Sequence, residues 1–141
     1  IFGNDIRQIP ADVTAKLGIE IVSLERLLAE SDIISINCDL NPTSYHLIGS
    51  KQFALMKPEA ILINTARGPI VSEPDLIEVL SSGKIAGAGL DVFEEEPLPP
   101  DSPLRSFDNC ILSAHSTNGS RHFWQKVHRN SLDRLYEGLG I

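Results

Sequence analysis

The chain has 141 residues, of which 42% are hydrophobic and 22% charged, and its formal net charge is −7. This ordinary globular composition suits one domain and excludes global disorder. The acidic balance argues against a nucleic-acid partner, because binding to phosphates needs a basic face. No apolar run reaches the length of a membrane span and no signal peptide is visible, so we expect no membrane partner.

Strand-like and helix-like segments alternate from the start of the chain to its end. Strands are predicted at residues 1–6, 19–23, 32–38, 60–64, 85–93 and 109–115, and helices at 11–18, 24–31, 50–56, 72–83 and 120–140. Ser23 and Ser72 stand at helix starts, the latter with Asp75 as a capping-box partner, and Gly18 and Gly83 stand at helix ends. This alternation predicts βαβ units and a parallel sheet.

Two of the predicted strands, 32–38 and 60–64, are continuous apolar runs, which are typical of strands buried on both faces. The two cysteines, Cys38 and Cys110, lie in such runs. We therefore expect buried thiols rather than a disulfide, which suits a reducing cytoplasm. Their spacing matches no metal motif, so no metal site is expected.

Three polar residues stand where apolar strands run into loops: Arg67 in NTARG, Glu96 in LDVFEEEP and His115 in CILSAHS. Polar groups at the ends of parallel strands are where open α/β folds build their sites. An arginine can hold a carboxylate in two hydrogen bonds, and a histidine can move a proton. Taken singly, each also fits a plainer role: a surface ion pair, a solvated acidic loop and a packed core histidine.

The neighbouring acids divide between solvated and site positions. We expect Glu94 and Glu95 to be solvated, whereas Glu96 is followed by a proline that restricts its backbone. Asp91 follows small residues, which admit either a close helix contact or a flat ring such as nicotinamide. Asp5 ends the opening strand and is either a turn residue or the acid that binds the adenosine ribose of a dinucleotide.

The other histidines are expected to have structural rather than catalytic roles. His46 lies in a loop that leads to a helix and could serve packing, while His122 and His128 lie on the last helix, at the surface or an interface. The chain has no G-x-G-x-x-G, and the glycines of AGAGLDV lack that spacing, so the pyrophosphate cradle of a dinucleotide fold is missing.

With these motifs in order, the chain resembles the D-isomer-specific 2-hydroxyacid dehydrogenases. The resemblance rests on SDIISINCDLNPTSYHLIG, on the long segment from MKPEAILINTARGP to EEEPLPPDSPL, and on NCILSAHS. Asp39, Ser72 and Ala114 depart from residues that are frequent in the family, without changing the three chemical groups. The glyoxylate/hydroxypyruvate reductase or glycerate dehydrogenase branch is favoured weakly.

The resemblance implies a role for each site residue. Arg67 would hold the substrate carboxylate, and Glu96 would support His115 as the general acid and base. The residues implied to contact the cofactor are Asp5, Cys38, Ser44, Thr65, Ala66, Arg67, Asp91 and His115. The cofactor would be NAD rather than NADP, and the substrate a small 2-keto or 2-hydroxy acid.

The resemblance also implies a fold: a partial Rossmann-like, doubly wound parallel sheet of the α/β class, lacking its first βαβ unit, plus a C-terminal helix. Residues 1–118 would be the C-terminal portion of an NAD-binding domain. Residues 119–141 would be a helix returning toward an absent substrate domain. The intact protein would be a cytoplasmic homodimer. Two alternatives stay open: a dinucleotide-sensing module like the corepressors of this architecture, and an inactive truncated fragment.

Overall fold

A computed structural model describes residues 1–116 and 119–140. The predicted domain boundary at residue 118 and the last residue, 141, lie outside this part. The α-helices are α1 (Ala11–Leu17), α2 (Leu24–Glu30), α3 (Ser50–Leu55), α4 (Glu73–Ser81) and α5 (Arg121–Leu139), and the 3-10 helices are η1 (Gly68–Ile70) and η2 (Pro103–Ser106). The strands are β1 (Phe2–Gly3), β2 (Glu20–Ile21), β3 (Ile33–Ile36), β4 (Ile61–Asn64), β5 (Gly87–Leu90) and β6 (Cys110–Leu112).

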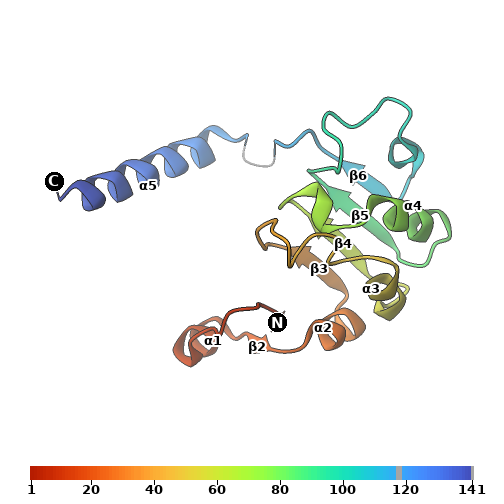
Figure 1. Cartoon of the computed structure of the whole chain (residues 1–141), viewed down its shortest axis with the longest axis horizontal. Helices are drawn as coiled ribbons and strands as arrows, with labels where there is room; N and C mark the ends of the chain where they lie inside the picture. The colour runs from red at the N-terminus through yellow and green to blue at the C-terminus, as the bar shows by residue number, and fades with distance from the viewer. Residues whose placement is uncertain (117–118, 141) are drawn as a thin grey trace.

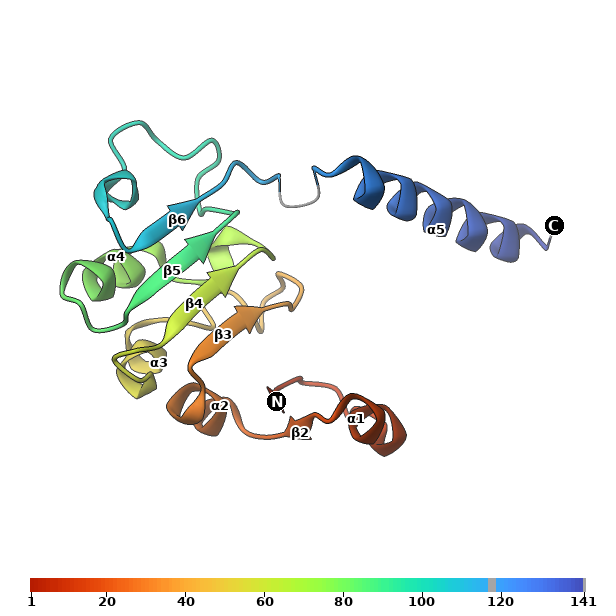
Figure 2. The same ribbon diagram turned by 180° about the vertical axis from the view of Figure 1, so that it is seen from behind.

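The strands form two parallel sheets (Figures 1 and 2). β3, β4, β5 and β6 pair in that order, which is also their order in the chain, and β1 pairs with β2 in a separate two-stranded sheet. All the strands of the larger sheet point the same way, so their carboxyl ends meet at one edge. The predicted α/β class with a parallel sheet is confirmed.

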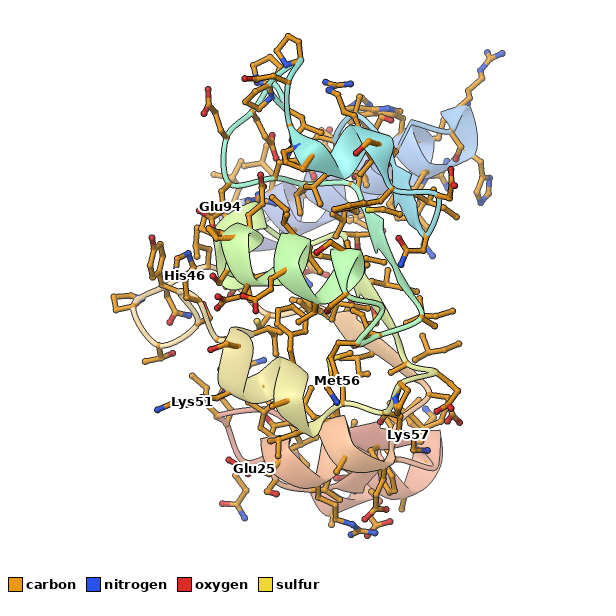
Figure 3. All side chains as sticks on the ribbon, turned by 90° about the vertical axis from the view of Figure 1, so that its right-hand side faces the viewer. Glu25, His46, Lys51, Met56, Lys57 and Glu94 are labelled. Atoms are coloured by element: carbon orange, nitrogen blue, oxygen red, sulfur yellow. The ribbon has the colours of Figure 1, made fainter. Side chains whose placement is uncertain are left out.

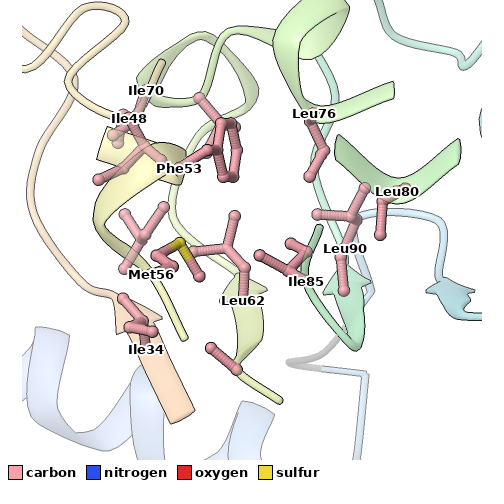
Figure 4. Close-up of a cluster of buried hydrophobic side chains, with 14 of the residues drawn as sticks. Ile34, Ile48, Phe53, Met56, Leu62, Ile70, Leu76, Leu80, Ile85 and Leu90 are labelled. Atoms are coloured by element: carbon pink, nitrogen blue, oxygen red, sulfur yellow. The ribbon is translucent and has the colours of Figure 1, made fainter. Parts of the chain in front are cut away.

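The core lies on one face of the larger sheet. Leu62 of β4 and Leu90 of β5 point into a cluster that Phe53 of α3 and Leu76 of α4 cover (Figure 4). Leu28 of α2 belongs to the same buried cluster. These side chains alternate along the strands with exposed ones, as the pleat requires. Burial of this face by α2, α3 and α4 is what holds the strand ends in place.

The opposite face corrects the prediction of strands buried on both sides. Ile33 is 62% exposed, Ile61 40% and Ile111 78%. The continuous apolar runs therefore alternate between a packed and an exposed face. Hydrophobicity alone could not show this, because both faces of these strands carry isoleucine or leucine.

The helix ends follow the predicted capping except at one position. The Ser23 hydroxyl accepts the amide of Arg26, and Gly18 and Gly83 adopt left-handed φ values of 64° and 67°. Ser72 precedes α4 but makes no side-chain cap. Its expected capping partner, Asp75, instead accepts the amide of Ser50 at 2.8 Å, which ties the start of α3 to α4.

The last helix, α5, projects away from the sheet in both ribbon views (Figures 1 and 2). Ser120 caps it by accepting the amide of Phe123, and none of its residues is buried. Trp124 is 53% exposed and Leu135 54%, so its apolar side is open. Within the described part of the chain, no helix is long and apolar enough to cross a membrane.

Candidate functional site

A cleft of about 440 Å³ lies at the carboxyl ends of β3 and β4. Residues 36–40, after β3, and residues 65–67, after β4, line it. The predicted residues Cys38, Thr65, Ala66 and Arg67 are thus brought together. They gather because the two strands are parallel neighbours and both run into loops at the same edge.

The turn after β4 is shaped by a buried amide that sequence reasoning missed. Asn64 is 1% exposed, and its side chain accepts the amide of Ala66 at 3.1 Å and donates to the carbonyl of Arg67 at 3.0 Å. This folds residues 65–67 back over the strand end. A polar residue at an inward position of an apolar strand was the available signal.

Arg67 sits at the rim of the cleft with its side chain in solvent. Its Nη1 donates to the carbonyl of Ala66 at 2.6 Å. The adjoining Gly68 is required by a close approach, because a Cβ there would lie 1.8 Å from the carbonyl oxygen of Phe93. The Arg67 loop is therefore pressed against the loop that carries Glu96.

Glu96 and His115 form a hydrogen-bonded pair. Nδ1 of His115 lies 2.8 Å from Oε2 of Glu96, and Oε1 of Glu96 accepts the amide of Phe93 at 3.0 Å. The pKa of Glu96 is lowered mainly by the hydrogen bond from His115, with help from the positive charge of Arg67. A charged carboxylate at Nδ1 makes that nitrogen the hydrogen-bond donor, and Nε2 takes no part in this hydrogen bond.

The backbone around His115 is held by Asp91. This aspartate is 2% exposed, and its carboxylate accepts the hydroxyl of Ser113 and, at 2.8 Å, the amide of Ser116. Its carbonyl accepts the amide of His115 at 2.9 Å. His115 adopts φ 52°, a left-handed value that non-glycine residues rarely take, so these bonds secure a strained conformation.

A second hollow of about 550 Å³ lies beside the Glu96–His115 pair. Besides these two residues, Phe93, Leu98 and Leu112 line it. Arg105 and Ser113 also line it, and the His115 side chain is 48% exposed. Arg67 thus lines the cleft, and His115 lines the second hollow.

Asp5 lies near the cleft but is already paired. Its carboxylate accepts the amide of Arg7 at 2.8 Å and Nη2 of Arg7 at 3.2 Å, and the hydrogen bonds from this arginine lower its pKa. Its negative charge, with that of Asp39, helps to raise the pKa of Cys38, for which burial is the larger cause. The negative charge of Asp5 therefore acts on Cys38, which lines the cleft.

Ser44 and the cysteines differ from expectation in their surroundings. The Ser44 side chain is buried, and its hydroxyl donates to the carbonyl of Asp39 at 2.6 Å and accepts the amide of Asn41 at 2.9 Å. It therefore closes its own loop. Both cysteines are free, as expected, but Cys38 is exposed and Cys110 half-buried, which corrects the prediction of two buried thiols. Burial raises the pKa of Cys110 to about 11.

His46 and Glu94, for which the sequence predicted a packing role and a solvated position, contact each other. Nε2 of His46 lies 2.8 Å from Oε1 of Glu94, so Glu94 is not simply solvated (Figure 3). Both belong to loops, where periodicity carries no signal, and only the fold brings residues so distant in the chain together. In the described ranges 1–116 and 119–140, no group of three or more His, Cys, Asp or Glu residues could hold a metal ion.

Comparison with known proteins shows the family to which the chain belongs. The family model "D-isomer specific 2-hydroxyacid dehydrogenase, NAD binding domain" matches residues 1–117. The chain belongs to this family. It is 49% identical over 109 residues to a glyoxylate reductase of Korarchaeum cryptofilum, covering 77% of this chain and 33% of that protein. It is 42% identical over 124 residues to glyoxylate/hydroxypyruvate reductase B of Yersinia pestis, covering 88% and 38%.

Solved structures agree with the family. The NAD-complexed D-isomer specific 2-hydroxyacid dehydrogenase of Lactobacillus delbrueckii ssp. bulgaricus has a TM-score of 0.80 and 29% sequence identity, covering 99% of this chain and 45% of that chain. The Rossmann-like fold and the family resemblance are therefore confirmed. The chain spans about a third of the length of the first curated relatives that it matches.

The cleft fits the cofactor of this family. NAD binds open α/β sheets outside the carboxyl ends of the strands, and that is where residues 36–40 and 65–67 form the hollow. The exposed loop backbone and Thr65 offer hydrogen-bonding groups, and Asp5 stands near the same wall. The family and the hydrogen-bonding groups of the cleft therefore both indicate NAD as the ligand.

Proposed function

We propose that this chain is part of an NAD-dependent reductase of small 2-keto acids, of the glyoxylate/hydroxypyruvate type. The observation that carries the proposal is the Glu96–His115 hydrogen bond of 2.8 Å, formed beside the loop of Arg67. The curated relatives named above bear the names of these reductases. Hydride transfer of this kind is reversible, so the same site would also oxidise 2-hydroxy acids.

The three side chains divide the work on the substrate. NADH bound in the cleft would supply the hydride to the carbonyl carbon. His115 would then donate a proton from Nε2 to the carbonyl oxygen, where negative charge develops. Arg67 would hold the substrate carboxylate with its planar guanidinium, and Glu96 would keep the imidazole oriented through Nδ1.

The remaining predicted residues would serve cofactor binding. The turn of Thr65 and Ala66, and Cys38 opposite, would line the cleft. Asp5 would bind the adenosine ribose and disfavour the 2′-phosphate of NADP, although Arg7 beside it must then accommodate the ribose as well. Asp91 would act close to the nicotinamide while it holds the His115 loop. Ser44 would shape the loop near the phosphates.

We further propose that the site is completed by segments outside these residues. The chain covers about a third of its relatives, and β1–β2 and β3–β6 form separate sheets. A glycine-rich phosphate loop and a substrate domain would come from the rest of a longer protein. Residues 1–118 would then be the C-terminal portion of the NAD-binding domain, and residues 119–141 a helix toward the substrate domain. That protein would be a cytoplasmic homodimer.

Turnover by the full-length protein that carries this chain tests the proposal. Oxidation of NADH should be followed at 340 nm with glyoxylate, hydroxypyruvate and pyruvate, and repeated with NADPH. We expect turnover of at least one 2-keto acid, with NADH preferred. Binding of NADH without turnover of any 2-keto acid would favour a dinucleotide-sensing module, and a preference for NADPH would contradict the role of Asp5.

A further inference from the structure

The acidic run after β5 carries two histidine–glutamate pairs, not one. Glu96 binds His115 on one side, and Glu94 binds His46 on the other, each at 2.8 Å. Figure 3 shows Glu94 and His46 side by side, the histidine on the loop that precedes α3. Nothing in the proposed chemistry uses the second pair, since neither residue lines the cleft or the hollow beside it.

Glu94 joins three segments of the chain. Its Oε1 accepts both Nε2 of His46 and, at 2.9 Å, the amide of Glu73 at the start of α4. Its own amide donates to Oε2 of Glu73 at 3.1 Å, which makes the contact reciprocal. The Glu94 side chain is 28% exposed despite its place in an acidic loop. The loop of His46, the start of α4 and the acidic run are thereby locked to one another.

This lock fixes the peptide on which the site pair depends. The Phe93–Glu94 peptide is pressed against Gly68, where a Cβ would lie 1.8 Å from the Phe93 oxygen and 2.5 Å from the Glu94 nitrogen. The amide of Phe93 in turn donates to Oε1 of Glu96 at 3.0 Å. The same short backbone segment therefore contacts the Arg67 loop and orients the carboxylate that binds His115.

His46 is held rigidly for this contact. It adopts φ 48°, a left-handed value that is disfavoured for histidine. Its amide donates to the carbonyl of Pro69 at 2.8 Å, and its ring stacks on that of Tyr45 with centroids 4.1 Å apart. A strained residue persists only where its surroundings determine its conformation, and such residues cluster at functional sites.

We propose that Glu94 and His46 are positioning residues of the reductase site, which hold the acidic run so that Glu96 reaches His115 beside Arg67. An exposed ion pair contributes little to stability. The expected consequence of the Glu94–His46 pair is therefore the position of the acidic run, not the stability of the fold. Small displacements of a catalytic group lower turnover strongly, because the reacting atoms must be aligned. This inference rests on the proposed function, and its test has a readout that does not require activity.

The test compares Glu94→Ala, His46→Ala and His46→Gln in the full-length protein, with Glu95→Ala as the control from the same acidic run. Glutamine can place its amide nitrogen where Nε2 of His46 donates. We expect kcat to fall about tenfold in both alanine variants of the pair, with the dissociation constant of NADH changed by less than about twofold. We expect His46→Gln to recover most of the activity and Glu95→Ala to keep all of it.

Amide hydrogen exchange supplies the activity-independent readout. In Glu94→Ala, exchange should quicken in a peptide that covers residues 91–98 and stay unchanged in one that covers β4. Unchanged kcat with unchanged exchange would overturn the proposal, as would faster exchange throughout the protein or a failure of His46→Gln to recover activity. A wild-type protein without turnover would contradict the proposed function instead, and the exchange comparison would still decide the positioning role.

Discussion

The sheet body and helix α5 both carry large apolar side chains, but only the body buries them. Leu62 in β4 and Phe53 in α3 are fully buried, whereas no residue of the 19-residue helix α5 is. The site residues all belong to the body or to the loops at its edge. The difference teaches that the site geometry is maintained by packing, whereas α5 is formed by local hydrogen bonds and caps alone.

The largest expected effect comes from opening a cavity in the body. Leu62→Ala should lower the free energy of unfolding by about 2–5 kcal/mol, because Leu62 is 0% exposed and its neighbours can only partly close the gap. The matched control is Ile111→Ala on the exposed face, where we expect a change below about 1 kcal/mol. Urea unfolding followed by circular dichroism measures both, and similar losses would remove the contrast between the faces.

The next effect separates chemistry from structure. His115→Gln should lower kcat at least about 100-fold in the full-length protein, since glutamine cannot serve as an acid at this pH range, while NADH affinity should stay within about twofold. His128→Gln on α5 is the control, with unchanged kcat expected. Steady-state kinetics and fluorescence titration give the two quantities. Near-normal turnover of His115→Gln would remove this histidine from the mechanism.

The lowered pKa of Glu96 predicts a pH-dependent contribution to stability. Because folding lowers the pKa of Glu96 below its ordinary value of 4.5, the contribution is fully present above pH 4.5 and is lost as the pH falls through the folded-state pKa. Glu96→Gln should therefore be less stable than wild type near neutrality, by no more than about 1 kcal/mol because the carboxylate is partly exposed. Unfolding curves recorded from pH 7 to pH 3 should converge, and a constant difference would contradict the assignment.

The smallest expected effect concerns α5. In the 141-residue chain, Trp124→Ala should change the free energy of unfolding by less than about 0.5 kcal/mol, since half of the indole is in solvent and nothing in the helix is buried. The same substitution in the full-length protein tests whether α5 packs against another domain. A loss above about 2 kcal/mol there would support that placement, and an equally small loss would contradict it.

Sequence reasoning located the elements and the strand ends but misjudged the surroundings of several residues. The alternation of strands and helices, the caps at Ser23 and Gly18 and the strand-end positions of Arg67, Glu96 and His115 are local, and they were predicted correctly. The exposed face of the sheet was not predicted, because a run of isoleucines indicates burial but does not show which face of the strand is covered. The capping box at Ser72 was not formed either, and the Asp75 carboxylate instead accepts a tertiary hydrogen bond from the amide of Ser50.

What the sequence by itself determined is therefore the set of elements, their parallel arrangement and the strand ends at which polar groups gather. Local propensity, hydrophobic periodicity and motif spacing carry that information along the chain. Only the tertiary structure decided that Glu96 binds His115, that Asn64 folds the Arg67 turn and that Glu94 binds His46. The two histidine–glutamate contacts join residues from different loops, whose separation in space depends on packing and is not encoded in any local pattern. The Asn64 contact is local in sequence, but the amide is buried only because the strand packs with this side facing inward.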